Sequence, residues 1–181
     1  MKRNRNKSFK LVLAALFLAV GMILPFFTAQ IPEIGSMLLP MHIPVLICGF
    51  VCGWRYGLIV GFITPLLRSM TFSMPPLFPS ATAMAFEMAA YGAICGLLYA
   101  RLPRGTKSVY VSLLAAMAGG RIVWGLVEIP ILGIAGRGYS WHAFVAGAFL
   151  NAVPGIILQI VMVPLIVIAL ERANVMEMQE K

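Results

Sequence analysis

The hydrophobic pattern divides the chain into six apolar runs separated by short polar or proline-containing breaks. These runs cover residues 9–27, 37–53, 57–72, 81–100, 109–134 and 143–170. A helix that crosses the hydrocarbon core of a bilayer needs about 20 mostly apolar residues, and most of the runs approach or exceed that length. We therefore expect an all-α fold, an integral membrane bundle of six transmembrane helices. Residues 1–181 would form a single transmembrane domain, with short tails at residues 1–8 and 171–181.

The second and third runs are the least regular of the six. Both are short and contain proline, and Pro65 and Arg68 interrupt the third run. The three prolines in residues 73–80 then prevent the helix from continuing, because proline lacks the N–H group and clashes with the preceding turn. We expect these two helices to be tilted, partly unwound or buried by their neighbours, because irregular backbone is not tolerated where it faces lipid.

The composition agrees with a membrane protein. Hydrophobic residues make up 61% of the chain and charged residues only 11%, whereas a soluble domain carries about 25% charged residues. The formal net charge of +8 could indicate a nucleic-acid partner, but the basic residues cluster beside apolar runs. Such clusters set membrane topology or contact anionic lipid. We therefore expect membrane lipid, and no nucleic acid, as a partner, and a multi-pass position in the cell (plasma) membrane.

The basic residues also predict the orientation of the bundle. Six crossings place both termini on one side, together with Arg55 and the loop at residues 101–107. Eleven of the 14 lysines and arginines then face the same compartment. Cytoplasmic loops carry an excess of lysine and arginine, so we expect the N-terminus and the C-terminus to be cytoplasmic.

A few polar residues lie within the apolar runs, and they fall in the outer half of the predicted bilayer. They are Arg68, Glu87, Arg121, Glu128 and Asn151, and His42 lies near the same face. Ionisable groups in hydrocarbon usually face the bundle interior or a water-filled cavity, where they mark a functional path. We therefore expect a solute-binding pocket that opens to the outside. The alternative is structural: the four charges sum to zero and could form two salt bridges between helices.

No motif for catalysis or nucleotide binding accompanies these residues. His42 and His142 occur without an HExxH motif or a nucleophile elbow, and the chain has no P-loop motif. We therefore expect no enzyme activity, no metal site and no cofactor. Cys48, Cys52 and Cys95 lie inside apolar runs and are interpreted as packing residues. Any energy for transport must then come from an ion gradient or from partner subunits.

Small residues four positions apart suggest close helix packing. Ala15 and Ala19 lie on one face of the first run, and Gly57 and Gly61 repeat the spacing in the third. Such pairs let another helix approach closely. The partner could be a separate membrane protein or another helix of the same bundle, and the spacing leaves both open.

Residues 37–57, 64–69, 74–79 and 151–155 carry a resemblance that extends over nearly the whole chain. The chain is similar to the substrate-binding S components of energy-coupling factor (ECF) vitamin transporters. Within that family, the segment at residues 41–44 most resembles the pantothenate-specific branch. The resemblance implies a high-affinity vitamin-capture subunit that works with a transmembrane coupling subunit and two ABC ATPase subunits. It also implies that Ala15 and Ala19 form the motif that docks on the coupling subunit.

The resemblance further implies where the vitamin binds. In these S components the substrate lies near the outer surface, held by the loops after the first and third spans and by spans four to six. For pantothenate, Arg68 or Arg121 would bind the carboxylate. The other members of the predicted site are His42, Glu87 and Asn151 for the hydroxyl and amide groups, Trp124 or Phe86 for the methyl groups, and Glu128.

Two alternatives remain open from the sequence. S components for different vitamins share one architecture, so the ligand could be another vitamin, such as a pyridoxine-like compound, folate or cobalamin. A stand-alone ion-coupled permease is a different class. Such carriers often contain internal repeats, and the sequence shows no convincing repeat.

Overall fold

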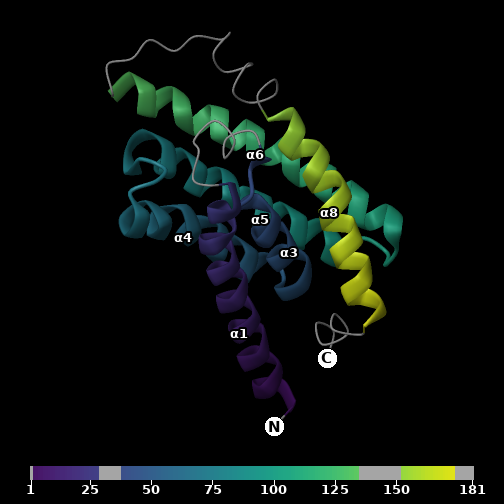
Figure 1. Ribbon diagram of the computed structural model, residues 1–181. Coiled ribbons are helices and arrows are strands. Elements are labelled where there is room, and N and C mark those ends of the chain that lie inside the picture. Colours follow the sequence, from purple (N-terminus) through teal and green to yellow (C-terminus); the bar gives the residue numbers. More distant parts are fainter. Residues whose placement is uncertain (1, 29–37, 135–151, 174–181) are drawn as a thin grey trace.

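The computed structural model describes residues 2–28, 38–134 and 152–173, which are helical apart from short connections (Figure 1). Its helical elements are α1 (Lys2–Ile23), the 3₁₀ turn η1 (Leu24–Thr28), α3 (His42–Cys52), α4 (Trp54–Phe72), the irregular π turn η2 (Leu77–Ala81), α5 (Thr82–Arg101), α6 (Thr106–Ile134) and α8 (Val153–Arg172). No strand occurs among these residues. The predicted all-α fold is therefore confirmed for the described part of the chain.

Four helical segments are long and apolar enough to cross a membrane. They are Lys7–Phe27, Leu77–Arg101, Thr106–Gly133 and Val153–Arg172. These segments correspond to the first, fourth, fifth and sixth apolar runs. The first helix begins earlier than predicted, because α1 already includes the basic residues that precede the apolar run. The predicted start of the sixth helix at residue 143 lies outside the described residues, and α8 is described from Val153.

The second and third helices differ from the other four. α3 has only 11 residues, about 16 Å of helix, which is too short to cross a hydrocarbon core of about 30 Å. It ends at Cys52. The next residue, Gly53, has a φ of 93°, a conformation that favours glycine, and α4 begins directly after it. α4 has 19 residues and contains Pro65 and Arg68. The prediction of a membrane-length helix over residues 37–53 is therefore wrong in its length.

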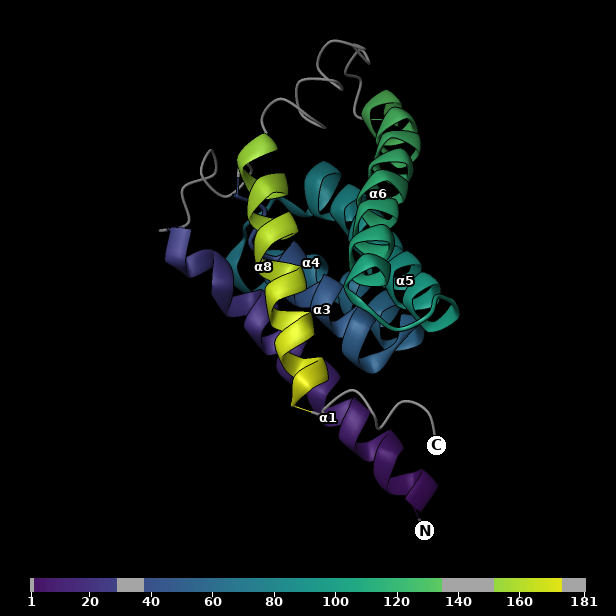
Figure 2. The same cartoon turned by 90° about the vertical axis from the view of Figure 1, so that its right-hand side faces the viewer.

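α3 lies inside the bundle. All of its residues from His42 to Cys52 are buried, because α1, α4, α5 and α8 pack against it. Figure 2 shows α3 between α8 and α5. Its surroundings are protein rather than lipid, which is the condition under which a short helix with irregular ends is tolerated at membrane depth. The expected burial of this segment by its neighbours is confirmed.

Glycines bring α3, α4 and α5 into backbone contact. A Cβ atom added at Gly92 of α5 would lie 2.3 Å from the carbonyl oxygen of Gly57 in α4. One added at Gly49 of α3 would lie 2.6 Å from the carbonyl oxygen of Gly92, and one at Gly61 would lie 2.3 Å from that of Met88. Side chains do not approach backbone oxygen atoms this closely, so only glycine permits the packing. The glycine pair of α4 therefore packs against another helix of the same chain.

Gly92→Ala is expected to destabilise the bundle by about 1–3 kcal/mol or more, because the added methyl group overlaps backbone atoms that cannot rotate away. The matched control is Gly133→Ala in α6, where an added Cβ atom meets nothing within 4 Å. This control should leave stability unchanged or raise it by up to about 1 kcal/mol, because alanine restricts the unfolded chain. Thermal unfolding of the purified variants in detergent measures both effects. Equal unfolding midpoints would contradict the proposed importance of the glycine contact.

The helix ends fall into two groups at opposite ends of the bundle. In Figure 2, the end of α6 at Ile134 and the start of α8 at Val153 lie towards the top. The start of α1 and the end of α8 at Arg172 lie towards the bottom in the same view. The start of α1 and the end of α8 therefore lie on the same side of the bundle.

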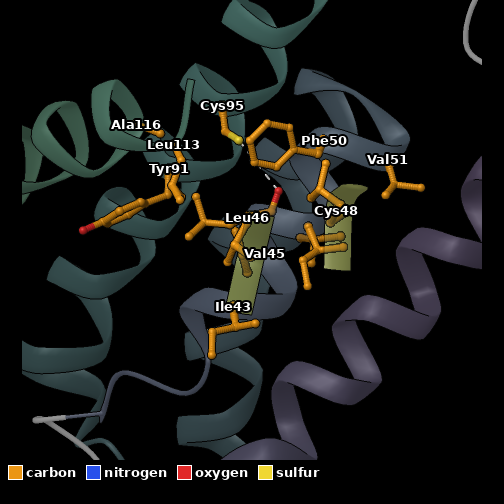
Figure 3. Close-up of a cluster of buried hydrophobic side chains, with 14 of the residues drawn as sticks. Ile43, Val45, Leu46, Cys48, Phe50, Val51, Tyr91, Cys95, Leu113 and Ala116 are labelled. Carbon is orange, nitrogen blue, oxygen red and sulfur yellow. Dashed lines mark hydrogen bonds between the residues drawn. The ribbon is translucent and has the colours of Figure 1, made fainter. Parts of the chain in front are cut away.

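An apolar cluster surrounds α3 (Figure 3). Leu46 and Phe50 of α3 are fully buried in it, next to residues of α5. Cys48, Cys52 and Cys95 also belong to this cluster, and the sulfur of Cys95 lies 3.8 Å from the carbonyl oxygen of Leu46. Their burial confirms the interpretation of the three cysteines as packing residues.

Candidate functional site

Three helices bring three of the predicted polar residues together inside the apolar bundle. His42 begins α3, Glu87 lies in the second turn of α5, and Arg121 lies midway along α6. Oε1 of Glu87 lies 3.0 Å from Nη1 of Arg121, and Oε2 of Glu87 lies 3.8 Å from Nε2 of His42. The side chains of His42, Glu87 and Arg121 are only 1%, 3% and 9% exposed, respectively. We call these three residues the polar cluster.

Tyr91 separates the polar cluster from the apolar core. It lies four residues after Glu87 and so on the same face of α5, and its ring packs edge-on against His42 with the ring centroids 5.2 Å apart. Figure 3 shows the Tyr91 hydroxyl pointing away from the apolar side chains, and this group lies beside the Arg121 side chain. Gly120 makes room for the ring, because a Cβ atom there would lie 2.6 Å from it. Tyr91 therefore adds a hydroxyl group to the edge of the polar cluster.

The polar cluster has hydrogen-bonding capacity that the described residues do not use. Both ring nitrogens of His42, Oε1 of Glu87, and Nε and Nη2 of Arg121 are buried without a hydrogen-bond partner. The contact between Glu87 and Arg121 is close enough for an ion pair, but its angles are not those of a hydrogen bond. A buried polar atom without a partner costs about 1–3 kcal/mol. Because native proteins rarely leave several such atoms together, the cluster has the properties of a site for a polar ligand.

Only one of the two salt bridges that a purely structural role would require is found among the described residues. It joins Arg121 and Glu87, whereas Arg68 and Glu128 are not paired with each other. A single buried ion pair contributes little net stability, because the loss of hydration offsets much of the attraction. The described residues therefore supply one of the two salt bridges of the structural alternative.

Arg68 lies apart from the polar cluster. It is 2% exposed, and its Nη1 donates a hydrogen bond to the carbonyl oxygen of Met22 near the end of α1. Its guanidinium carbon also lies 5.0 Å from the ring centroid of Phe26 and 5.2 Å from that of Phe72. Such cation–π contacts stabilise a desolvated arginine. Arg68 thus joins the end of α1 to α4, and it does not contact His42, Glu87, Arg121 or Glu128, the other predicted polar residues that the structure describes.

The remaining predicted residues lie around the polar cluster or outside the described ranges. Trp124 and Glu128 are half-buried on α6, about one and two turns beyond Arg121. Phe86 is 43% exposed on the surface of α5. Asn151 lies outside the residues that the structure describes. The described part of the predicted site is therefore divided between a buried centre and a less buried extension along α6.

The comparison with protein families decides the class of the protein. A model of the substrate-specific component of ECF transporters matches residues 9–167, which is most of the chain. The chain belongs to this family. As an ECF substrate-specific component, it is a membrane-embedded transport protein that binds a small-molecule substrate, and its family is one of transport components rather than of enzymes. Its partners are the transmembrane and ATPase subunits of an ECF transporter. Neither a curated protein nor a solved structure matches the chain significantly.

The small-residue pair of α1 lies on the outer surface of this ECF component. Ala15 and Ala19 are exposed, whereas Ala14 is only 4% exposed. The inner side of α1 packs closely, since a Cβ atom at Gly21 would lie 3.0 Å from Cγ2 of Thr64 in α4. The exposed apolar residues next to the alanine pair are Leu11, Val12, Leu16, Val20 and Ile23. The alanines thus form a shallow strip, and no described helix covers it.

The sequence did not point to two buried polar residues of the ECF component. Tyr91 could have been found from its i+4 spacing to Glu87. Gln159 of α8 is fully buried, and within the described part of the chain its Oε1 and Nε2 atoms have no hydrogen-bond partner. Apart from Asn151, it is the only carboxamide residue in the last apolar run, and this composition was the signal available in the sequence.

Proposed function

We propose that the protein is the high-affinity vitamin-capture subunit of an ECF-type importer and that its substrate is pantothenate. The polar cluster carries this proposal, because it combines a buried carboxylate, guanidinium and imidazole with unused hydrogen-bonding atoms. Pantothenate has a carboxylate, an amide, two hydroxyl groups and a gem-dimethyl group. The polar cluster provides donors and acceptors for the polar groups. The rings of Trp124 and Tyr91 provide apolar surface for the methyl groups.

The proposal includes an orientation in the plasma membrane. Both termini and the loop at residues 101–107 face the cytoplasm, and the vitamin enters the polar cluster from the outside. The positions of the charges support this orientation. Glu87 lies 14 residues before Arg101 on α5, about 21 Å along the helix axis. The polar cluster and the basic loop are therefore near opposite faces of the membrane.

Thiol labelling tests this orientation. Ser73→Cys is expected to react with a membrane-impermeant reagent in intact cells, whereas Thr106→Cys should react only after permeabilisation. Both positions are exposed, and one follows α4 while the other begins α6. The three cysteines of the chain are buried, and they are first replaced by alanine so that each variant carries a single cysteine. Labelling of position 106 in intact cells would contradict the orientation.

Calorimetry with the purified full-length chain and a panel of vitamins tests the substrate. Pantothenate is expected to bind with the highest affinity, because it is the panel member whose polar groups the cluster matches. Tighter binding of a pyridoxine-like compound, folate or cobalamin would reject pantothenate but retain the capture function. Reconstitution into vesicles tests that function. The chain alone should bind but not accumulate the vitamin, and uptake driven by an ion gradient without ATPase subunits would instead identify a permease.

A further inference from the structure

We propose that the edge of Arg121 formed by Nε and Nη2 binds the carboxylate of the substrate and determines the preference for an anionic ligand. This inference rests on the proposed function, since it concerns the same polar cluster. It adds to that function by naming the recognised group and the protein atoms that recognise it.

The hydrogen-bonding pattern of Arg121 carries the inference. A guanidinium group is planar, and its Nε–H and one Nη2–H bond point in the same direction, spaced to match the two oxygens of a carboxylate. In this protein Nη1 faces Glu87 at 3.0 Å, while Nε and Nη2 are buried without a hydrogen-bond partner among the described residues. The side chain is 9% exposed, so water competes little for these donors. Two parallel donors are therefore available on the side of Arg121 away from Glu87.

Glu87 holds this edge in position. Its Oε1 faces Nη1 of Arg121, and its Oε2 lies 3.8 Å from Nε2 of His42, so the carboxylate is placed between α3 and α6. A second carboxylate can bind Arg121 despite the charge of Glu87. The attraction acts at contact distance, whereas the repulsion between the two carboxylates acts across the width of the guanidinium group and is weaker. Glu87 is thus a positioning residue, and the substrate contacts Arg121.

The structure distinguishes Arg121 from the other buried arginine. Arg68 already donates a hydrogen bond to the carbonyl oxygen of Met22, and the rings of Phe26 and Phe72 lie next to its guanidinium group. Arg68 therefore serves as the control for Arg121, since it is also a buried arginine but is not expected to bind the carboxylate.

The test measures the affinities of the purified full-length protein for pantothenate and for pantothenol, in which an alcohol replaces the carboxylate. The wild type is expected to bind pantothenate at least about thirtyfold more tightly, because only the carboxylate forms the charged two-donor contact. Arg121→Lys keeps a charge that pairs with Glu87 but lacks the planar edge. In this variant the preference should fall to about threefold or less through weaker pantothenate binding. Arg68→Lys should keep the wild-type ratio of the affinities for pantothenate and pantothenol, even if both affinities change.

Each outcome bears on the inference. A wild-type preference that survives in Arg121→Lys, or that disappears in Arg68→Lys, would overturn it. Equal wild-type affinities for the two compounds would also overturn it, and this comparison requires no variant to fold. If the wild type binds neither compound, the proposed substrate is wrong. The same comparison is then made with the vitamin that the panel identifies and with an analogue of it that lacks the carboxylate. If the identified vitamin has no carboxylate, the inference is overturned. A protein that binds no vitamin overturns both proposals.

Discussion

Ala15→Trp is expected to abolish vitamin uptake by the assembled transporter while leaving vitamin binding to the isolated subunit nearly unchanged. Ala15 and Ala19 lie on the exposed side of α1, and the polar cluster is built from α3, α5 and α6. Small residues four positions apart allow another membrane helix to approach closely, and an indole ring prevents that approach. The substitution should therefore remove docking without disturbing the substrate site. Ala19→Trp should have the same effect.

Neighbouring positions on α1 provide the controls. Ala14→Trp places the ring at a residue that is 4% exposed, so this variant should lose stability and binding as well as uptake. Leu16 is 55% exposed and already large, so Leu16→Trp should retain more uptake than Ala15→Trp. Uptake of labelled vitamin into proteoliposomes and calorimetry on the isolated subunit separate docking from binding. Loss of binding in isolated Ala15→Trp would show that this residue has an internal packing role instead.

Glu87→Ala is expected to destabilise the isolated subunit by about 3–5 kcal/mol, because it leaves the charge of Arg121 buried without its carboxylate partner. For a chain of this size, such a loss lowers the unfolding midpoint by roughly 10 °C. Thermal unfolding in detergent without ligand measures the effect. Glu128→Ala is the control, since Glu128 is a half-buried glutamate on α6 that forms no salt bridge within the described residues.

A double substitution tests the cause of this destabilisation. Replacing Glu87 and Arg121 together with apolar residues of similar size removes both charges, so the double variant should be more stable than either single variant. This result would not be expected if each side chain contributed only its own packing. A double variant as unstable as the sum of the single variants would contradict the buried ion pair. Vitamin binding should be lost in all three variants.

The long helices could be predicted from the sequence because their signal is local. Apolar runs of membrane length and the prolines after Phe72 determine where α5 and α6 begin and end to within a few residues, without reference to the rest of the chain. The prediction was wrong for the length of α3, whose sequence is as apolar as that of a crossing helix. Its end before Gly53 and its complete burial depend on close contact with α4 and α5. Hydropathy measures the preference for leaving water, and it does not distinguish burial in lipid from burial in protein.

The candidate residues of the site also came from local information, whereas their partners did not. Arg68 and Arg121 are equivalent in the sequence, since each is a single arginine within an apolar run. In the structure, one contacts Met22 and aromatic rings, and the other faces Glu87. Which groups meet depends on the rotation of each helix about its axis and on the packing that fixes this rotation.

The two pairs of small residues illustrate the same division. Ala15 and Ala19 have the spacing of Gly57 and Gly61, and the sequence left an internal or an external partner open for both pairs. The two glycines pack against the backbone of α5, whereas the two alanines remain on the surface. The sequence by itself determined the helical membrane fold and the charged residues that lie within the apolar runs, because these follow from the hydration of each segment. Only the tertiary structure decided which faces and which charges meet, because contacts between helices depend on the shapes of both surfaces.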